Sequence, residues 1–177
     1  MHILELTANL FAVVIGIVSA VTDARVRKIY NVVTYPGVLA GFVFHTVAAL
    51  LCQRGIAGFL FSLYGFLLGF GFFFIFYWMS RGKKMGAGDV KLYAAVGACL
   101  GVNATFYSLI ITALVGLLIS IVLLFPIVFM VIRTGRLSIF QEYKNYPIPY
   151  GTVIGISVTI WVILRIIGLL ENLPFYI

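Results

Sequence analysis

Long runs of apolar residues alternate with short polar segments along the whole chain. An α-helix that crosses a bilayer needs about 20 consecutive apolar residues, and most of these runs reach that length. The runs occupy residues 4–22, 32–52, 56–79, 89–102, 104–132 and 151–170. The pattern therefore predicts an all-α membrane protein of about six transmembrane helices.

The fourth and fifth runs are separated only by the dipeptide Val102–Asn103. A single helix over residues 89–132 would be about 66 Å long at about 1.5 Å per residue, which is far too long for one crossing. We therefore expect two helices that are joined by a tight turn at this dipeptide.

The composition indicates that lipid is the main solvent of this chain. Hydrophobic residues make up 63% of the sequence and charged residues 10%, whereas a soluble domain is about half apolar and about a quarter charged. No polar stretch is long enough to form a separate soluble domain, so residues 1–177 are expected to form one integral-membrane domain. The net charge of +7 does not indicate nucleic acid, because the basic residues lie in short clusters beside apolar runs.

The distribution of these basic residues predicts an orientation. Nine of the twelve follow the first, third or fifth apolar run, which places them on one side if the helices alternate in direction. They are Arg25, Arg27, Lys28, Arg81, Lys83, Lys84, Arg133, Arg136 and Lys144. Arg54 lies on the opposite side, and Lys91 and Arg165 fall within apolar runs. The positive-inside rule places the nine-residue side in the cytoplasm.

The chain has only two aspartates, and both are expected at the cytoplasmic ends of helices. Asp23 follows the first run, which travels inward, and Asp89 opens the fourth run, which travels outward. The two carboxyl groups should therefore lie at similar depth. Ionisable residues at membrane depth are costly and are usually functional.

Two carboxyl groups that are held close together are suited to peptide hydrolysis. Both cannot ionise easily, so one keeps its proton while the other stays charged. The charged group can take a proton from water, and the protonated group can support the scissile carbonyl. A metal site is not expected, because two aspartates without a nearby His or Glu bind a cation weakly. Cys52 and Cys99 form no CxxC pair that could supply ligands.

Other interpretations of the two aspartates remain open. Asp89 could be the N-cap of the fourth helix, and Asp23 could mark the membrane boundary. A small transporter or channel could use both as a proton or cation path, although its acids would lie deeper in the bilayer. A non-catalytic subunit of a secretion apparatus would tolerate replacement of either aspartate by asparagine.

Three stretches resemble the GxGD aspartyl proteases of membranes, and among them the type IV prepilin peptidases. They are TDARVRKIYN (22–31), GAGDVKLYAAVGACLG (86–101) and IPYG (148–151). The resemblance implies that Asp23 and Asp89 are the catalytic pair. It also points to Lys91, which follows the second aspartate, and to Asn31, whose amide could cap the second helix. Tyr30 occupies the family's usual proline position, which leaves the shape of that turn open.

Gly86 and Gly88, which flank Ala87 just before the second aspartate, have a physical role under this interpretation. Glycine permits a positive φ and leaves room for another backbone beside it. An extended substrate segment could then lie against this loop, as peptides do when they add to an exposed backbone edge. We therefore expect Gly86 and Gly88 to shape the loop.

The resemblance implies an aspartic endopeptidase of the inner (cytoplasmic) membrane that needs no cofactor. Its partners would be the lipid bilayer and a prepilin or pseudopilin, which has a short basic leader, a cleavage site usually after Gly, and then a hydrophobic helix. Larger members carry an N-terminal four-cysteine cluster and also N-methylate their product. This sequence lacks that cluster and resembles the short form that serves Flp (tight-adherence) pili or archaeal preflagellins, of which the IPYG match favours the first. Methylation with S-adenosylmethionine is not implied.

Two further features have plain structural interpretations. His45 lies within the second run, where we expect no acidic partner at its depth, so packing or hydrogen bonding is its predicted role. The segment 133–150 is the longest polar stretch. It could cover the cytoplasmic site or dock substrate, or it could simply link the last two spans.

Overall fold

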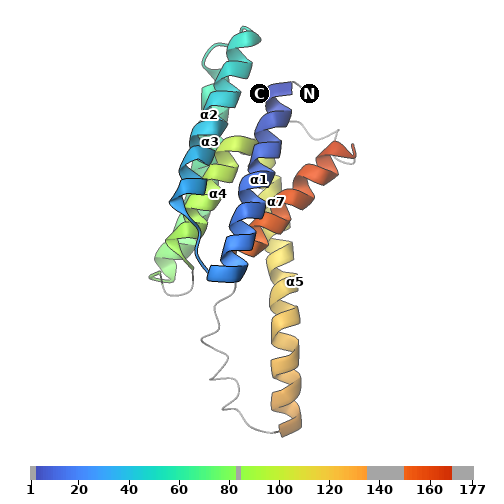
Figure 1. Cartoon of the computed structure of the whole chain (residues 1–177). Coiled ribbons are helices and arrows are strands. Elements are labelled where there is room, and N and C mark those ends of the chain that lie inside the picture. Colours follow the sequence, from blue (N-terminus) through green and yellow to red (C-terminus); the bar gives the residue numbers. More distant parts are fainter. Residues whose placement is uncertain (1–2, 83–84, 135–149, 169–177) are drawn as a thin grey trace.

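The computed structural model describes residues 3–82, 85–134 and 150–168, and among these it contains six α-helices and no β-strand (Figure 1). The helices are α1 (Ile3–Val26), α2 (Asn31–Leu51), α3 (Ala57–Met79), α4 (Ala87–Leu100), α5 (Val102–Thr134) and α7 (Tyr150–Ile166). Each predicted run corresponds to one helix, so the all-α membrane architecture is confirmed. Lys83, Lys84, Arg136, Lys144 and most of the segment 133–150 lie outside the described residues.

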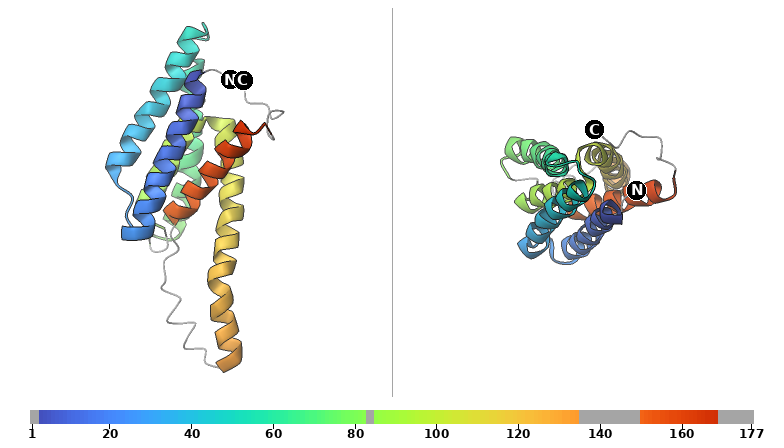
Figure 2. Two further views of the ribbon diagram at one scale, coloured as in Figure 1. Left: turned by 45° about the vertical axis from the view of Figure 1, so that its right-hand side comes forward. Right: turned by 90° about the horizontal axis from the view of Figure 1, so that it is seen from above.

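Successive helices run in opposite directions, as the two side views show (Figure 1; Figure 2, left). The ends of α1 and α3 therefore share one end of the bundle with the beginnings of α4 and α7. The connection from α2 to α3 lies at the other end. The long helix α5 extends past the remaining helices on the side where α1 finishes (Figure 1).

Four helices, α1, α2, α3 and α5, are long and apolar enough to cross a membrane. The helix α7 is also apolar but has 17 residues, and α4 has 14. A helix of 14 residues is about 21 Å long, which is less than the hydrocarbon thickness of roughly 30 Å. Because α4 packs against all five other helices, its ends need not reach the two bilayer surfaces.

The break between α4 and α5 lies at Gly101 rather than at the predicted dipeptide Val102–Asn103. Gly101 has φ 75° and ψ 175°, a conformation that residues with a Cβ rarely adopt. A Cβ at this position would also collide with the ring of Phe61. The two-helix prediction is therefore confirmed, but the chain uses a glycine one residue earlier to make the turn.

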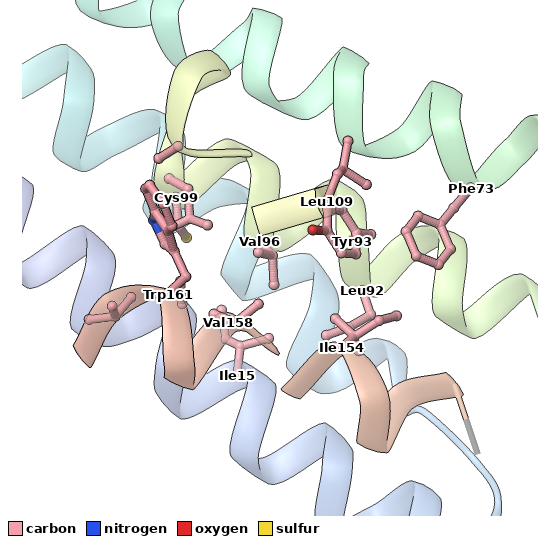
Figure 3. Packing of buried hydrophobic residues seen from close by; sticks show 14 of the residues in the cluster. Ile15, Phe73, Leu92, Tyr93, Val96, Cys99, Leu109, Ile154, Val158 and Trp161 are labelled. Carbon is pink, nitrogen blue, oxygen red and sulfur yellow. The ribbon is translucent and has the colours of Figure 1, made fainter. Parts of the chain in front are cut away.

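The core is built around α4, in which every residue from 92 to 100 is buried. Its large side chains pack with residues of α1, α3, α5 and α7, as Figure 3 shows for Tyr93, Val96, Ile15, Phe73 and Trp161 among others. Small residues bring the backbones close. Gly65 of α3 contacts Gly97 of α4 directly, and this is the type of contact by which small residues let membrane helices approach.

Candidate active site

Asp23 lies inside α1 rather than just beyond it. The apolar run ends at residue 22, but the helix continues to Val26. The side chain of Asp23 is 8% exposed because α1 packs against the beginning of α7. Arg27 then adopts φ 53° and ends the helix, and the chain turns into α2.

Asp89 is the third residue of α4, two positions after the helix begins at Ala87. It is 7% exposed. The N-cap is Gly86, so the interpretation of Asp89 as the N-cap residue itself is wrong. Its carboxylate nevertheless caps the helix, because Oδ2 accepts a hydrogen bond of 3.1 Å from the backbone N–H of Gly86.

The two glycines before Asp89 act through space rather than through an unusual backbone conformation. Gly86 has φ −78° and ψ 148°, and Gly88 is helical, so the expected positive φ is not used. The expected room for a second backbone is confirmed at Gly88. A Cβ there would lie 3.0 Å from Cβ of Ile29, which belongs to the connection between α1 and α2.

The beginning of α7 brings a third element to the aspartates. Oδ2 of Asp23 accepts a hydrogen bond of 3.2 Å from the backbone N–H of Thr152. Gly151 fits only because it has no side chain, since a Cβ would lie 2.9 Å from Oδ2 of Asp23 and 3.0 Å from Cδ1 of Ile29. Ile29 thus lies between Gly88 and Gly151 and connects the two parts of the site.

Asp23 and Asp89 interact electrostatically, and Tyr150 at the beginning of α7 is also within the electrostatic reach of Asp89. The structure therefore brings the two predicted aspartates to one end of the bundle, both buried. Among the described residues, each carboxylate accepts one hydrogen bond, and each does so from the N-terminus of a helix. Helix N-termini carry a partial positive charge that favours the ionised form of a carboxyl group.

Lys91 and Asn31 form a separate contact between α4 and α2. The Nζ of Lys91 donates to Oδ1 of Asn31 at 3.1 Å and to the hydroxyl of Tyr35 at 3.3 Å. The ammonium group also lies 5.4 Å from the centre of the Tyr35 ring. The expectation that Asn31 caps α2 is wrong, because Tyr30 is the N-cap and makes no side-chain cap bond.

Tyr30 itself keeps the turn in the shape that a proline would give. Its φ of −85° and ψ of 134° are extended, and this backbone conformation is close to the one that proline favours. The substitution of the family's proline therefore leaves the path from α1 into α2 compatible with the family's turn.

Sequence reasoning did not foresee how Ile29, Tyr150, Gly151 and Thr152 would contribute to the site. The IPYG motif marked the right segment, but only as the opening of the last helix. Its glycine meets Asp23 across 128 residues of sequence, which no local pattern reports. Among the described residues, no group of three His, Cys, Asp or Glu side chains lies close enough to hold a metal ion.

The fold and the site define a multi-pass helical membrane protein with an aspartate pair at one end of its bundle. Residues 10–121, which include both aspartates, match the model of the type IV leader peptidase family, and the chain belongs to this family. No solved structure matches the chain.

Two curated relatives are prepilin leader peptidase/N-methyltransferases. The protein from Dickeya chrysanthemi is 28% identical over 166 residues, which cover 93% of this chain and 53% of the relative. The protein from Aeromonas salmonicida (strain A449) is 28% identical over 96 residues, which cover 54% of this chain and 28% of the relative. The chain therefore spans about half the length of the first relative and less of the second.

Proposed function

We propose that this chain is an aspartic endopeptidase that cleaves the leader peptides of prepilin-like proteins, with Asp23 and Asp89 as its catalytic pair. Membership of the type IV leader peptidase family supports peptidase activity. The observation that carries the assignment is the convergence of the only two aspartates of the chain, which are buried and electrostatically coupled at one end of the bundle.

In the proposed reaction, the ionised aspartate removes a proton from a water molecule that attacks the scissile carbonyl carbon. The protonated aspartate donates a hydrogen bond to the carbonyl oxygen as negative charge develops there. Proton transfer to the leaving nitrogen then releases the leader and the mature N-terminus. The hydrogen bonds from Gly86 and Thr152 fix the orientation of the two carboxyl groups through their Oδ2 atoms.

The approach to this pair suits an extended peptide. Gly86 and Ala87 are exposed, and the backbone of Gly86 is itself extended. An exposed extended segment offers backbone groups with which a substrate strand can pair. We infer that the residues around the scissile bond lie along Gly86 and Ala87, and that the hydrophobic helix of the substrate remains in the lipid.

The site is proposed to face the cytoplasm from the inner membrane. The described basic residues that follow α1, α3 and α5 lie on the side where those helices finish, which is also the side of the aspartates. They are Arg25, Arg27, Lys28, Arg81 and Arg133. Arg54 lies at the opposite end, between α2 and α3. The positive-inside rule supports this orientation.

Processing of a candidate prepilin in cells tests the proposal. The chain would be co-expressed with the prepilin, and loss of the leader would be followed on a gel for the wild type, Asp23→Asn, Asp89→Asn and Lys91→Ala. Asparagine keeps an oxygen that can accept the helix-capping hydrogen bond but cannot cycle a proton. We expect both asparagine variants to accumulate normally and to leave the prepilin uncut.

The capping hydrogen bonds also favour a second function, that of a non-catalytic assembly subunit in which both aspartates only stabilise helix ends. Under that function Asp23→Asn and Asp89→Asn would be silent, whereas Asp23→Ala and Asp89→Ala would lower the abundance of the protein. Cleavage at the wild-type level by both asparagine variants would favour this alternative over the peptidase.

A further inference from the structure

A cavity of about 200 Å³ lies at the end of the bundle opposite the aspartates. It is enclosed by the beginnings of α1 and α3 and by the ends of α2, α4 and α7 (Figure 1). Its polar lining residues are Glu5, Asn9, His45, Arg54, Tyr64 and Arg165. Glu5 and Asp23 are 18 positions apart on α1, which corresponds to about 27 Å along the helix. The cavity is therefore a separate site from the candidate active site.

The expectation that His45 has no acidic partner at its depth is wrong, because Glu5 lines the same cavity and interacts with His45 electrostatically. The predicted hydrogen-bonding role of His45 is confirmed. Its Nε2 lies 2.7 Å from the backbone oxygen of Cys99, which can only accept, so Nε2 carries the proton. In the neutral ring, Nδ1 is then an acceptor.

Asn9 gives the second observation. Its side chain is 2% exposed and lines the cavity, and no hydrogen bond of its amide to any other described residue occurs. Buried amides almost always have hydrogen-bond partners, because leaving them without one costs free energy. An amide in this situation on the wall of a polar cavity indicates that the partner is a group that enters the cavity.

The charges of the lining define the chemistry of that group. Two guanidinium groups, of Arg54 and Arg165, and one carboxyl group, of Glu5, leave an excess of one positive charge with His45 neutral. Arginine is the side chain best suited to phosphate, because its planar donors match two phosphate oxygens at once. A phosphate group would therefore complement the lining.

The walls are apolar, which favours an amphiphilic ligand over a free ion. Ala48, Ala49, Leu60 and Leu100 line the cavity beside the polar groups. It lies where α1, α2 and α7 begin or end, and this is the depth of the lipid headgroups in a spanning bundle. Its volume would hold about six water molecules at about 30 Å³ each, which suits a headgroup while the acyl chains stay in the bilayer.

We propose that this cavity binds the phosphate-bearing headgroup of a phospholipid, with Arg54 and Arg165 contacting the phosphate and Asn9 completing the hydrogen bonds. Basic pockets between transmembrane helices bind phospholipid headgroups by the same combination of charge and apolar walls. A bound headgroup would fasten the ends of α1, α2, α3 and α7 together at the end of the bundle away from the aspartates.

The test uses the purified full-length chain in detergent, to which mixed micelles with equal parts of phosphatidylethanolamine and phosphatidylglycerol are added. Retained lipid is counted by native mass spectrometry, and the thermal unfolding midpoint is measured with and without lipid. We expect Arg54→Gln and Arg165→Gln each to weaken lipid binding about tenfold. Arg133→Gln, which removes an arginine at the end of α5 instead, should bind lipid like the wild type.

Two further arms keep the result decisive. Ala57→Trp places a bulky side chain at the exposed edge of the cavity and keeps both arginines, so it should also lose lipid while its helicity by circular dichroism is unchanged. Inorganic phosphate alone is added in place of lipid. Equal lipid binding by all variants would overturn the proposal, and so would stabilisation by inorganic phosphate that matches the stabilisation by lipid.

Discussion

The helices α4 and α5 are joined by a single glycine and are both apolar, yet their surroundings are opposite. In α4, 11 of the 14 residues are buried. In α5, which has 33 residues, the 18-residue window that satisfies the membrane criterion has 0% of its residues buried. Both would be called transmembrane by hydropathy, so hydropathy alone does not report whether a helix faces protein or lipid.

Residue size is what distinguishes the two helices. Gly and Ala account for 6 of the 14 residues of α4 but for only 3 of the 33 residues of α5. Small residues allow helix backbones to touch, whereas large aliphatic residues suit contact with lipid chains. The helix with the small residues is also the one that carries Asp89, so close backbone packing positions the second carboxyl group.

The largest effect is expected where that backbone packing is broken. In α3, a Cβ at Gly69 would lie 2.5 Å from the backbone oxygen of Tyr93 in α4, whereas nothing lies within 4 Å of a Cβ at Gly71. Gly69→Leu should cost at least about 3 kcal/mol, because backbone cannot move aside as a side chain can. The membrane abundance and the unfolding midpoint should fall for Gly69→Leu and stay near wild type for Gly71→Leu. Equal behaviour of the two variants would contradict the packing of α3 on α4.

A second large effect is expected from one methyl group in the core of α4. Leu92 is 0% exposed, and Leu92→Ala should cost about 2 to 5 kcal/mol because it leaves a cavity. The matched change in α5 is Leu118→Ala, where the side chain is 62% exposed, and its cost should stay below about 0.5 kcal/mol. Denaturation in the same detergent measures both, and similar costs would remove the distinction between the two helices.

An effect on activity without an effect on folding is expected at Gly151. The Cβ of Gly151→Ala would press on Oδ2 of Asp23 and on Ile29. A displacement of a catalytic group by about 1 Å can cost about a hundredfold in rate, so we expect leader cleavage to slow by that order. Gly116→Ala in α5 is the control, because its Cβ would make only an ordinary contact of 3.5 Å with Val153. A wild-type rate for Gly151→Ala would show that this glycine does not hold Asp23 in place.

The smallest effect is expected at the contact between α4 and α2. Lys91→Ala removes both hydrogen bonds to Asn31 and Tyr35 and should cost about 1 to 2 kcal/mol of stability. Tyr35→Phe keeps the ring beneath the ammonium group and should cost less than half as much. Thermal unfolding of the two variants measures the difference, and a larger loss for Tyr35→Phe would show that the hydroxyl rather than the lysine matters.

Much of this fold could be predicted from the sequence because membrane helices are local features. Apolar runs fixed the existence and approximate limits of all six helices, and their lengths required the break between α4 and α5. The end of α1 was misplaced because its last turn contains Asp23 and Arg25, which are polar residues that the helix nevertheless accommodates. The turn at Gly101 was misplaced by one residue because apolar runs do not report which backbone conformation makes a turn.

The site was predictable in its residues but not in its contacts. Asp23 and Asp89 could be paired because alternating helices place their ends on a known side. The hydrogen bond from Thr152 to Asp23 joins residues 129 positions apart, and it depends on how α7 packs on α1. The same holds for Asn31, whose amide meets Lys91 instead of capping α2, and for His45, which shares a cavity with Glu5. Such pairs follow from tertiary packing and have no local signal.

The most direct test of the central claim is the rate of leader cleavage by purified, reconstituted protein with Asp23→Asn, Asp89→Asn and both changes together. If the two carboxyl groups act as one catalytic unit, each single change should slow cleavage by about a thousandfold or more, and the double change should be no slower than either single change. All three variants should unfold at temperatures close to that of the wild type. A wild-type cleavage rate in either single variant would contradict the assignment of Asp23 and Asp89 as a catalytic pair.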